Sequence, residues 1–485
     1  MAGPGVNGKP DPEARGTTWR LAEVLRATGG ECLSGPRETA FGGVSTDTRS
    51  LRPGELFVAL RGERHDGHDF VAEALRRGAA GVLVEARATE AQHAARGAGG
   101  RAALIAVADT LRALGDLASF HRRRRRAFVL AITGSNGKTT TRRMTAAVLA
   151  RRYAVLEPER NWNNLVGVPL TLLRLEPGHE AAVLELGTNR PGEIARLTEI
   201  CAPDAGLITN IGPAHLEGLG SLEGVLAEKA ALVYGLAPDR SALLNADDPL
   251  LRRLGRECGR RVILFGTGEE AHVRAAGVEV APGRTAFDLA TDAGNARVEL
   301  PVAGACFVGN ALAAAAAGRL LGLPPEEIAA GLAAFRPAPG RLEIRELPGG
   351  ITVIDDSYNA NPASVRAAIE TLSALRGAAR GIVVLGEMRE LGAGAAAWHR
   401  EAGRLAAQSG AARLYACGPW SGEVARGACE AGLSPAAVVT GGREEIGAAL
   451  RETLRPGDWV LVKGSRAAAM EAIVEMLSRR TPREG

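Results

Sequence analysis

The chain has 485 residues, more than one hydrophobic core usually holds, so its length predicts about three domains. Its 59 basic and 55 acidic residues leave a net charge of +4, which favours neither a nucleic acid nor a membrane surface as the partner. No segment approaches the ~18 consecutive apolar residues of a membrane span, and the start of the chain lacks the apolar stretch of a signal peptide, so we expect a cytoplasmic protein.

The first block, residues 17–126, is typical of a small α/β domain. Short apolar runs at residues 56–60, 81–84 and 103–107 alternate with Gly-rich turns and two helix-like stretches. The block ends in five consecutive arginines, residues 122–126. We interpret this run as a solvated linker or helix end, with a phosphate-binding or RNA-binding patch as the alternative.

The second block, residues 127–336, alternates apolar strands with helical stretches such as residues 226–234. This pattern predicts βαβ units and a mainly parallel sheet of the P-loop type. The Ala-rich run 311–317 predicts a tightly packed buried helix. Strands are expected at residues 128–133, 181–185, 205–210, 242–245 and 262–265.

The third block, residues 337–480, follows a short Pro- and Gly-rich linker and repeats the pattern. It predicts a second open parallel sheet, Rossmann-like, so the expected fold class is α/β with three domains. Its strands are expected at residues 351–355, 381–386, 413–417, 437–440 and 459–463.

Polar side chains gather where these strands end. In open parallel sheets, ligands bind outside the carboxyl ends of the strands. The residues expected there are Glu185, Asn210, Asp247, Asp355, Asp356, Glu387 and Lys463.

Lysine is rare, although basic residues are common. The only lysines are Lys9, in the Gly- and Pro-rich start, and Lys138, Lys229 and Lys463. An ammonium is compact and can lose its proton, whereas a guanidinium is a planar fork that stays charged. Each of the last three positions is therefore a candidate for a site that needs an amine; the alternative is a codon bias that left a few lysines behind.

The strongest motif is the loop Gly134, Ser135, Asn136, Gly137, Lys138, Thr139 and Thr140, between a strand and a helix. Its glycines let backbone N–H groups and the helix N-terminus point at a phosphate. Lys138 can reach the β- and γ-phosphates, and the Thr139 hydroxyl can ligate Mg²⁺. The usual pattern has a glycine where this chain has Ile132, so the setting and not the motif alone favours a nucleotide site over an ordinary turn. We predict ATP and Mg²⁺ as cofactors.

Three further residues follow along the second block. Glu185 ends a strand, and its carboxylate suits Mg²⁺. His215 follows another strand, where a structural or surface histidine is the commoner alternative. Lys229 lies on a predicted helix, where a surface lysine is the alternative.

The third block carries two motifs. Residues 355–362, Asp-Asp-Ser-Tyr-Asn-Ala-Asn-Pro, could contact ribose, phosphate or a substrate, and an Asx-capped turn is an equal alternative. Lys463 and Arg466 lie near a strand end, where they could neutralise an anionic phosphate or carboxylate.

These motifs together resemble the Mur ligase family, the ATP-dependent amide-bond enzymes of peptidoglycan synthesis. The resemblance is carried first by residues 132–140 and then by five or six motifs in the same order, from about residue 44 to residue 470. Folylpolyglutamate synthetases share a similar loop. The resemblance implies an N-terminal UDP-substrate-binding domain (17–126), a central ATP-binding domain (127–336) and a C-terminal ligase domain (337–480).

The resemblance also implies roles for individual residues. Lys138, Glu185, His215 and Lys229 would be catalytic, with Lys229 carbamylated to a bridging carboxylate and with Thr139, Glu185 and His215 as metal ligands. Nucleotide contacts would come from residues 134–140 and from Asn310, Arg341 and Asp356. Where the family usually has a His-Asn pair ahead of Asn310, this chain has Cys306 and Phe307.

The implied substrates are UDP-MurNAc-tripeptide and D-alanyl-D-alanine. Residues 45–49 resemble the UDP-binding module of the tripeptide- and pentapeptide-forming members, residues 161–169 resemble the substrate loop of the pentapeptide-forming members, and no Asp-Asn-Pro-Arg string is present. The substrate-binding residues implied are Ser45, Thr46, Asp47, Arg49, Asn163, Asn164, Tyr358, Asn359, Asn361, Lys463, Ser465 and Arg466.

The reaction implied is an acyl-phosphate ligation that forms one amide bond per ATP. Its alternatives are a folylpolyglutamate synthetase, a P-loop switch or regulatory ATPase, and a non-catalytic nucleotide-binding relative. The first is disfavoured by residues 45–49, the second leaves the third-block motifs unexplained, and the third is weakened by Lys138, Glu185 and Lys229. We expect a monomer.

Overall fold

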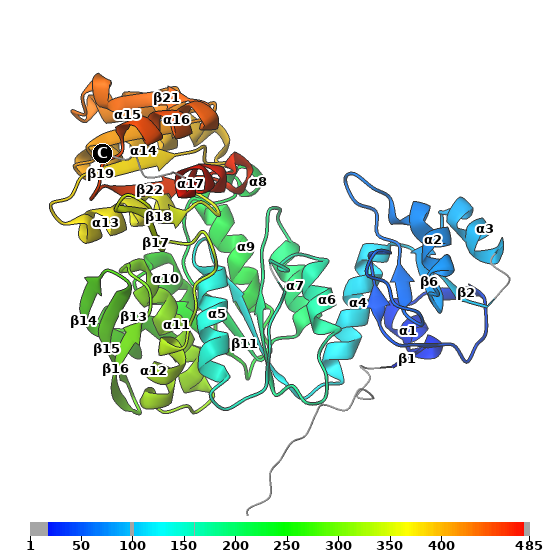
Figure 1. Cartoon of the computed structure of the whole chain (residues 1–485). Coiled ribbons are helices and arrows are strands. Elements are labelled where there is room, and N and C mark those ends of the chain that lie inside the picture. The colour runs from blue at the N-terminus through cyan, green and yellow to red at the C-terminus, as the bar shows by residue number, and fades with distance from the viewer. Residues whose placement is uncertain (1–17, 98–100, 160, 480–485) are drawn as a thin grey trace, which may run out of the picture. The chain divides into compact units, whose positions relative to one another are not determined.

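The structure, a computed structural model, describes residues 18–97, 101–159 and 161–479. These described residues form four sheets, of two, five, nine and six strands, whose elements are labelled in Figure 1. The described residues divide into two compact units: the first holds 18–97, 101–127, 156–159, 161–182 and 199–202, and the second holds 128–155, 183–198 and 203–479. The predicted α/β class is confirmed, and the boundaries of the three predicted domains remain a prediction.

The five-stranded sheet of the first unit has the order β2-β7-β6-β5-β4. Its strands pair in parallel, except that β2 runs antiparallel to β7, and a separate ribbon pairs β1 with β3. The strands are β1 (Trp19–Arg20), β2 (Glu31–Ser34), β3 (Ala40–Phe41), β4 (Val44–Ser45), β5 (Leu56–Val58), β6 (Gly81–Glu85) and β7 (Ala103–Val107).

Helices cover both faces of this sheet. One hydrophobic cluster includes Val24 and Leu114, and the cluster on the other face includes Val71 and Ala91. Because both faces are buried, β7 is apolar at every position. Leu170 packs against the first cluster, which places α6 in this unit. The helices are α1 (Leu21–Thr28), α2 (Val71–Arg76), α3 (Thr89–Gly97), α4 (Thr110–Arg123) and α6 (Gly167–Leu172), with a 3-10 turn at Gly67–Phe70.

The arginine run begins inside α4, and its first member is not solvated. Arg122 is 7% exposed, and its guanidinium donates hydrogen bonds to the carbonyls of Cys201 (3.1 Å) and Ala202 (3.2 Å). Arg124 pairs with Glu23 at 2.7 Å. The helix-end interpretation is confirmed, but solvation of the whole run is wrong, because Arg122 caps the carbonyls at the end of another helix.

The nine-stranded sheet has the order β16-β15-β14-β13-β12-β11-β8-β10-β9. The neighbours β8, β11, β12, β13 and β14 pair in parallel, as the sequence predicts for this block, and β14, β15 and β16 continue as an antiparallel extension. The strands are β8 (Phe128–Thr133), β9 (Val155–Leu156), β10 (Ala181–Glu185), β11 (Ala205–Ile208), β12 (Ser241–Asn245), β13 (Arg261–Gly266), β14 (Val273–Ala281), β15 (Arg284–Thr291) and β16 (Gly294–Leu300).

Three helices, α5, α11 and α12, pack against one another (Figure 1). The predicted buried helix at residues 311–317 is confirmed, since it lies in α11. A Cβ on Gly331 would lie 2.5 Å from the Cα of Val148, so this glycine lets two helix backbones approach closely. The helices of this part are α5 (Lys138–Leu149), α7 (Glu193–Cys201), α8 (Leu216–Leu219), α9 (Leu222–Tyr234), α10 (Pro249–Glu257), α11 (Cys306–Leu320) and α12 (Pro325–Ala333).

The six-stranded sheet has the order β17-β18-β22-β19-β20-β21. Only β17 is antiparallel to its neighbour among these described strands, and the other five confirm the predicted parallel sheet. The strands are β17 (Glu343–Leu347), β18 (Ile351–Asp356), β19 (Gly381–Leu385), β20 (Arg413–Cys417), β21 (Val438–Gly441) and β22 (Trp459–Lys463).

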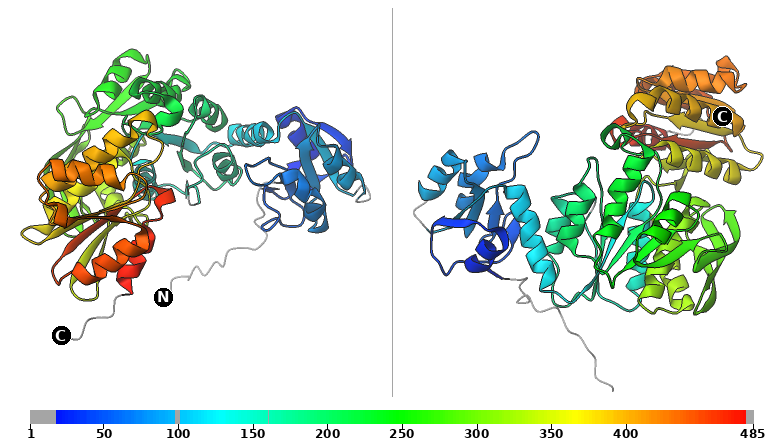
Figure 2. Two further views of the ribbon diagram at one scale, coloured as in Figure 1. Left: turned by 90° about the horizontal axis from the view of Figure 1, so that it is seen from above. Right: turned by 180° about the vertical axis from the view of Figure 1, so that it is seen from behind.

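Helices also cover both faces of this sheet (Figure 2). Ile446 and Ile473, from α16 and α17, join one buried cluster with Val353 and Val462. Helices α13, α14 and α15 pack on the other side. The bounds are α13 (Pro362–Arg376), α14 (Ala395–Gln408), α15 (Ser421–Glu430), α16 (Arg443–Thr453) and α17 (Glu471–Ser478), with 3-10 turns at Gly392–Gly394, Pro435–Ala437 and Arg466–Ala468. In the described part of the chain, no helix is long and apolar enough to cross a membrane.

Candidate active site

The predicted phosphate loop lies between β8 and α5. Gly134 (φ 147°) and Gly137 (φ 78°) both take backbone conformations that side chains disfavour. A Cβ on Gly134 would lie 1.9 Å from the Thr209 hydroxyl oxygen, and a Cβ on Gly137 would lie 2.3 Å from Asn310 Oδ1. Both glycines are therefore required by the geometry, and the strand–loop–helix setting is confirmed.

Residues after β11 brace this loop from one side. The backbone N–H of Asn136 donates to Asn210 Oδ1 at 2.9 Å, and the Thr209 hydroxyl donates to the Asn136 carbonyl at 2.6 Å. The Ser135 hydroxyl donates to the carbonyl of Gly212 at 3.0 Å. These contacts hold the loop in shape without a ligand. The sequence placed Asn210 at a strand end but gave no sign of the roles of Thr209 and Gly212.

The side chain of Lys138 folds back over the loop. Its ammonium donates to the carbonyl of Gly134 at 2.8 Å, and the Ser135 carbonyl lies 3.4 Å away. Burial lowers the pKa of Lys138 below its ordinary value, and the charge of Glu185 opposes that shift. A phosphate at the loop would offer this ammonium anionic oxygens in place of neutral carbonyls.

Replacing Gly137 with alanine should damage the loop. Alanine at φ 78° is strained, and its Cβ would meet Asn310. We expect the KM for ATP to rise by about tenfold or more, since backbone N–H groups would no longer point at the phosphates. Gly178→Ala is the control, because that glycine has open space around it and no positive φ. An unchanged KM in Gly137→Ala would contradict the assigned loop geometry.

Thr139 and Glu185 lie together at the first turn of α5. The Thr139 hydroxyl donates to Glu185 Oε2 at 2.8 Å, and Arg341 Nη2 donates to the same hydroxyl at 3.1 Å. Glu185 is 3% exposed, and Arg142 Nε lies 3.9 Å from its carboxylate. A hydroxyl and a buried carboxylate are ligands that Mg²⁺ takes together with phosphate oxygens. The residues present therefore fit the predicted cation.

The described residues contain no group of three or more His, Cys, Asp or Glu side chains able to hold a metal ion by themselves. A Mg²⁺ that shares its coordination sphere with a nucleotide and water does not need such a group. The assignment of Thr139, Glu185 and His215 as ligands stays a prediction.

Asn310 lies on α11 against the loop. Its Oδ1 accepts a hydrogen bond from the Thr141 hydroxyl at 3.3 Å and lies beside Gly137. Phe307, which stands where the family usually has a polar residue, is 4% exposed and packs in the core, whereas Cys306 is exposed. Thr140 is buried in the first turn of α5. Asn310 is thus next to the phosphates' expected position.

Lys229 lies on α9 and is 1% exposed. Burial, together with the charge of Lys138, lowers its pKa from 10.5 to about 7, and the charge of Glu228 opposes the shift. The surface-lysine alternative is therefore wrong. An amine that is neutral in half of the molecules near pH 7 is able to act as a nucleophile toward CO₂.

His215 begins the turn that leads into α8. Its Nδ1 lies 2.5 Å from Glu390 Oε2, and the hydrogen bond from His215 holds the pKa of Glu390 below its ordinary value. The backbone N–H of Glu217 donates to the Glu390 carbonyl at 3.1 Å. Sequence reasoning missed Glu390, because the two segments are far apart in the chain and neither carries a recognisable metal-ligand spacing.

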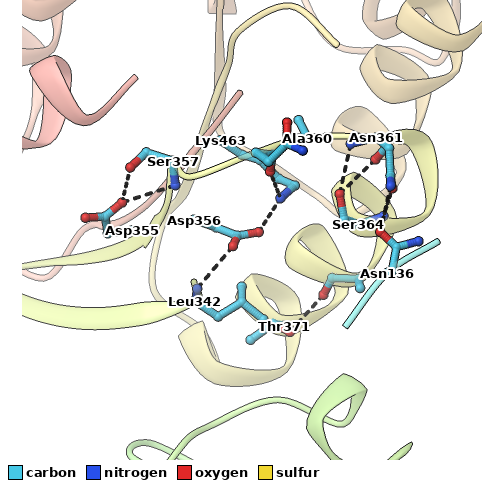
Figure 3. A network of polar contacts seen from close by, with 12 residues as sticks. Asn136, Leu342, Asp355, Asp356, Ser357, Ala360, Asn361, Ser364, Thr371 and Lys463 are labelled. Atoms are coloured by element: carbon cyan, nitrogen blue, oxygen red, sulfur yellow. Dashed lines mark hydrogen bonds and ion pairs between the residues drawn. The ribbon is translucent and has the colours of Figure 1, made fainter. Parts of the chain in front are cut away.

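The acidic motif of the third block forms a polar network with Lys463 (Figure 3). The Asp356 carboxylate accepts a hydrogen bond from the Leu342 N–H at 3.2 Å and pairs with the Lys463 ammonium, which also donates to the Asn359 carbonyl at 2.9 Å. Asp355 instead accepts from the Ser357 hydroxyl at 2.6 Å. Asp356 and Lys463, predicted to bind nucleotide and substrate, are thus brought together.

Other motif residues surround this network. Arg341 lies over the ring of Tyr358, with 4.2 Å between its Cζ and the ring centroid, and Arg466 lies 6.0 Å from the same centroid. The Asn361 amide donates to Asn136 Oδ1 of the phosphate loop at 2.6 Å and also caps α13. Ser465 is buried, and its backbone N–H donates to the Glu387 carbonyl at 2.9 Å. The capped-turn alternative is therefore confirmed for Asn361 alongside its contact with the loop.

A pocket of about 410 Å³ lies within the first unit. Ser45, Thr46 and Asp47 line it from one segment, and Trp162 and Asn164 line it from another. The two motifs predicted to bind the UDP-linked substrate thus meet at one cavity, although they are far apart in the sequence.

The remaining predicted residues of this region lie beside the pocket's lining. Arg49 pairs with Asp47 at 2.6 Å and is largely exposed. The Asn163 amide donates to Asn161 Oδ1 at 2.9 Å, and Asn164 Oδ1 accepts from the Gly167 N–H at 2.9 Å at the start of α6. Asn164 therefore shapes the loop as well as lining the pocket.

Three family models match successive parts of the chain. The model of the Mur ligase family catalytic domain matches residues 41–122, that of the Mur ligase middle domain matches 132–318, and that of the Mur ligase glutamate ligase domain matches 340–466. A UDP-N-acetylmuramoyl-tripeptide--D-alanyl-D-alanine ligase of Bacillus subtilis is 35% identical over 463 residues, which is 95% of this chain and 98% of that protein. The chain belongs to the Mur ligase family.

Solved structures agree with this Mur ligase along nearly its whole length. MurF from Acinetobacter baumannii superposes with a TM-score of 0.87 at 32% identity, covering 96% of this chain and 100% of that chain. MurF from Thermotoga maritima, solved in complex with ADP, gives a TM-score of 0.80 at 29% identity over 90% of this chain and 97% of that chain. The predicted three-domain fold class, the ATP-dependent ligase class and the use of ATP with Mg²⁺ are confirmed for this Mur ligase.

Proposed function

We propose that this Mur ligase joins D-alanyl-D-alanine to UDP-N-acetylmuramoyl-tripeptide in the cytoplasm and converts one ATP to ADP and phosphate for each amide bond. The observation that carries the proposal is the pocket of the first unit, where Ser45, Thr46 and Asp47 meet Trp162 and Asn164. Relatives named for this reaction share 35–39% identity with the chain over most of its length, which supports the same substrates here.

The reaction needs a phosphoryl transfer followed by an acyl transfer. The tripeptide carboxylate attacks the γ-phosphorus, ADP leaves, and an acyl phosphate forms. The amine of D-alanyl-D-alanine then attacks the acyl carbon, and inorganic phosphate leaves from the tetrahedral intermediate. Both steps build negative charge, so positioning and electrostatic stabilisation account for most of the catalysis.

Residues of the phosphate loop are assigned to the nucleotide. Lys138 exchanges its bonds to the Gly134 and Ser135 carbonyls for the β- and γ-phosphates, and the N–H groups of residues 134–140 hold the same oxygens. Mg²⁺ held by Thr139 and Glu185 would neutralise phosphate charge during transfer. Asn310 and Arg341, which contact this loop through Thr141 and Thr139, are assigned to the nucleotide as well, and Asp356 orients Lys463 beside it.

The remaining assignments follow from burial and charge. Lys229, buried with a pKa of about 7, is assigned to a carbamate that serves as a carboxylate ligand, and His215 to a cation site with Glu185. The cationic pair Lys463 and Arg466 would receive the substrate carboxylate or the acyl phosphate. Tyr358, Asn359, Asn361 and Ser465 would line that position, and Arg49 and Asn163 would complete the UDP-substrate site.

We assign residues 17–126 to the UDP substrate, 127–336 to ATP and 337–480 to ligation, in a monomer without a nucleic-acid partner. One assay tests the reaction: phosphate release in the presence of UDP-MurNAc-tripeptide, with and without D-alanyl-D-alanine. We expect release that requires both substrates and a product whose mass equals the two joined less one water. Release that ignores either substrate would favour a switch or regulatory ATPase.

Replacing Thr46 with valine should weaken binding of the UDP substrate alone. Thr46 lines the pocket, and losing one neutral hydrogen bond of about 0.5–1.5 kcal/mol corresponds to a roughly 2–12-fold higher KM for UDP-MurNAc-tripeptide. The KM for ATP should stay unchanged. Thr48→Val is the matched control, because Thr48 belongs to the same motif but does not line the pocket. Equal effects of the two variants would argue against this pocket as the binding site.

A further inference from the structure

Glu390 lies in the loop between β19 and α14 and meets the segment that carries His215. Its Oε2 is 2.5 Å from His215 Nδ1, and its carbonyl accepts the N–H of Glu217 at 3.1 Å. Both the side chain and the main chain of Glu390 thus contact the turn that leads into α8. The Glu390 side chain is 47% exposed, so the main-chain contact, and not burial, restricts the geometry of this pair.

The two residues of this pair have the same unusual backbone. His215 has φ 56° and Glu390 has φ 62°, in the left-handed region that non-glycine residues rarely occupy. Such conformations are destabilising and persist where the surroundings impose them. Both members of the pair are therefore held in backbone conformations that the surrounding contacts impose.

The loop that carries Glu390 is held along its length. The N–H of Gly386 donates to the Lys463 carbonyl at 2.7 Å, and the Glu387 carbonyl accepts the N–H of Ser465 at 2.9 Å. The N–H of Met388 donates to His399 Nε2 at 2.9 Å. These bonds hold residues 386–388, just before Glu390, against the end of β22 and against α14.

His399 can hold this loop because it is neutral. Its Nδ1 faces the Ala395 carbonyl at 2.7 Å and must carry a proton there, which leaves Nε2 as the acceptor for Met388. The ring is 1% exposed and stacks on Trp420, with 5.5 Å between centroids. Burial lowers the pKa of His399, so this acceptor persists through the neutral range.

The contact with Glu390 also decides which nitrogen of His215 carries the proton. A carboxylate oxygen 2.5 Å from Nδ1 favours an N–H at that nitrogen and disfavours a lone pair there, because the negative charge repels the lone pair and attracts the N–H dipole. In the neutral ring Nε2 is then unprotonated, which a nitrogen must be to bind a cation. Carboxylates that orient metal-binding histidines in this way change metal affinity by about 10–100-fold when they are removed.

We propose that Glu390 is a positioning residue that fixes the Nδ1–H tautomer of His215 and so presents an unprotonated Nε2 to a divalent cation. The inference rests on the proposed function only for the role of His215 as a cation ligand. The fixed tautomer itself is a property of the free chain. The alternative is a purely structural role, in which the His215–Glu390 contact only joins two segments. That role would need the contact but not the Nδ1–H tautomer.

The first experiment reads the tautomer without nucleotide, cation or substrate. The chain is labelled with ¹⁵N-histidine, and the ring nitrogens are observed by NMR, with His215→Gln identifying the signal of His215. We expect Nδ1–H in the wild type and in Glu390→Gln, whose amide oxygen still accepts a hydrogen bond. Glu390→Ala should move His215 toward Nε2–H or an exchanging mixture. An unchanged tautomer in Glu390→Ala would overturn the proposal.

The second experiment measures Mn²⁺ binding in the presence of a non-hydrolysable ATP analogue. Glu390→Ala should weaken the affinity by about 10–100-fold, and Glu390→Gln should recover much of the loss. Glu217→Gln is the matched control, because it removes an exposed carboxylate from the neighbouring segment. Equal Mn²⁺ affinities in Glu390→Ala and wild type, with only a lower Tm in the variant, would show a structural latch and contradict the inference. If the wild-type chain showed no ligase activity, the proposed function would be refuted, but the result on the His215 tautomer would still stand.

Discussion

Replacing Lys138 with methionine should reduce ligase turnover by about 10³-fold, a loss of roughly 4 kcal/mol of transition-state stabilisation. The ammonium already lies over the phosphate loop, bonded to the Gly134 carbonyl, and methionine keeps its length while removing its charge. The measurement is the initial rate of phosphate release with both substrates present, together with the Kd for ATP. We expect the rate to fall much more than the affinity, because the charge that Lys138 meets increases during phosphoryl transfer.

Two further variants sharpen this result. Lys138→Arg should fail nearly as badly, because a planar guanidinium cannot occupy the small space within the loop that an ammonium fills. Arg151→Met removes one positive charge from an exposed site just beyond α5 and should leave the rate near that of the wild type. A rate in Lys138→Arg close to the wild-type rate would show that only the charge matters and would contradict the role given to the amine.

Replacing Lys229 with methionine should reduce turnover by about 10³-fold. The same substitution should raise the thermal stability. Lys229 is 1% exposed, and its burial as an ammonium opposes folding. Methionine has a similar length and no charge to desolvate. We expect an increase in Tm of about 3–10 °C at pH 6, as a gain of a few kcal/mol gives in a chain of several domains.

The stability gain should depend on pH in one direction. Lys229 titrates near pH 7 in the folded chain and near 10.5 when unfolded. Below pH 7 both states bind the proton, so the full penalty opposes folding of the wild type. Between pH 7 and 10.5 the unfolded state binds more protons, so the stability of the wild type rises with pH. The advantage of Lys229→Met should therefore shrink between pH 6 and pH 9.

Controls separate this effect from a general one. Arg253→Met removes a charge from an exposed position on α10 and should show no gain that varies with pH. A gain of equal size at pH 6 and pH 9 in Lys229→Met would contradict a lowered pKa. For the proposed carbamate, Lys229→Ala leaves a space that a short carboxylate such as acetate could fill. Partial recovery of turnover by acetate would support it, and normal turnover of Lys229→Ala would exclude it.

Sequence reasoning located the strands whose sheets are buried on both faces. Strands β7, β20 and β22 agree with their predicted residues because continuous apolar runs mark a strand between two helix layers. The antiparallel extension was missed because it is half exposed. In β16, buried Val298 and Leu300 alternate with exposed Arg297 and Glu299, and a short alternation of this kind is easily taken for a loop.

The site divides in a similar way. Gly134, Gly137 and Lys138 could be predicted because their spacing along the chain is the motif itself. The bracing of the loop by Thr209 and the pairing of His215 with Glu390 depend on contacts between distant segments. No local spacing records such contacts, so they become visible only in the folded chain. The burial of Lys229 belongs to the same class, because a helix sequence of ordinary polarity does not reveal which face meets the core.

The close packing of α11 on α5 sets the tolerance of this protein to substitution. A run of alanines often suggests a permissive segment, because Leu and Met form helices nearly as readily as Ala and also prefer a core. Residues 311–317 are buried in α11, which packs on α5, and a Cβ on Gly318 of α11 would already lie 2.8 Å from Val148 Cγ1 of α5. Enlarging one of these alanines would push α11 outward and carry Asn310 away from Gly137. In a saturation mutagenesis screen, this alanine run should therefore be as intolerant as the phosphate loop itself.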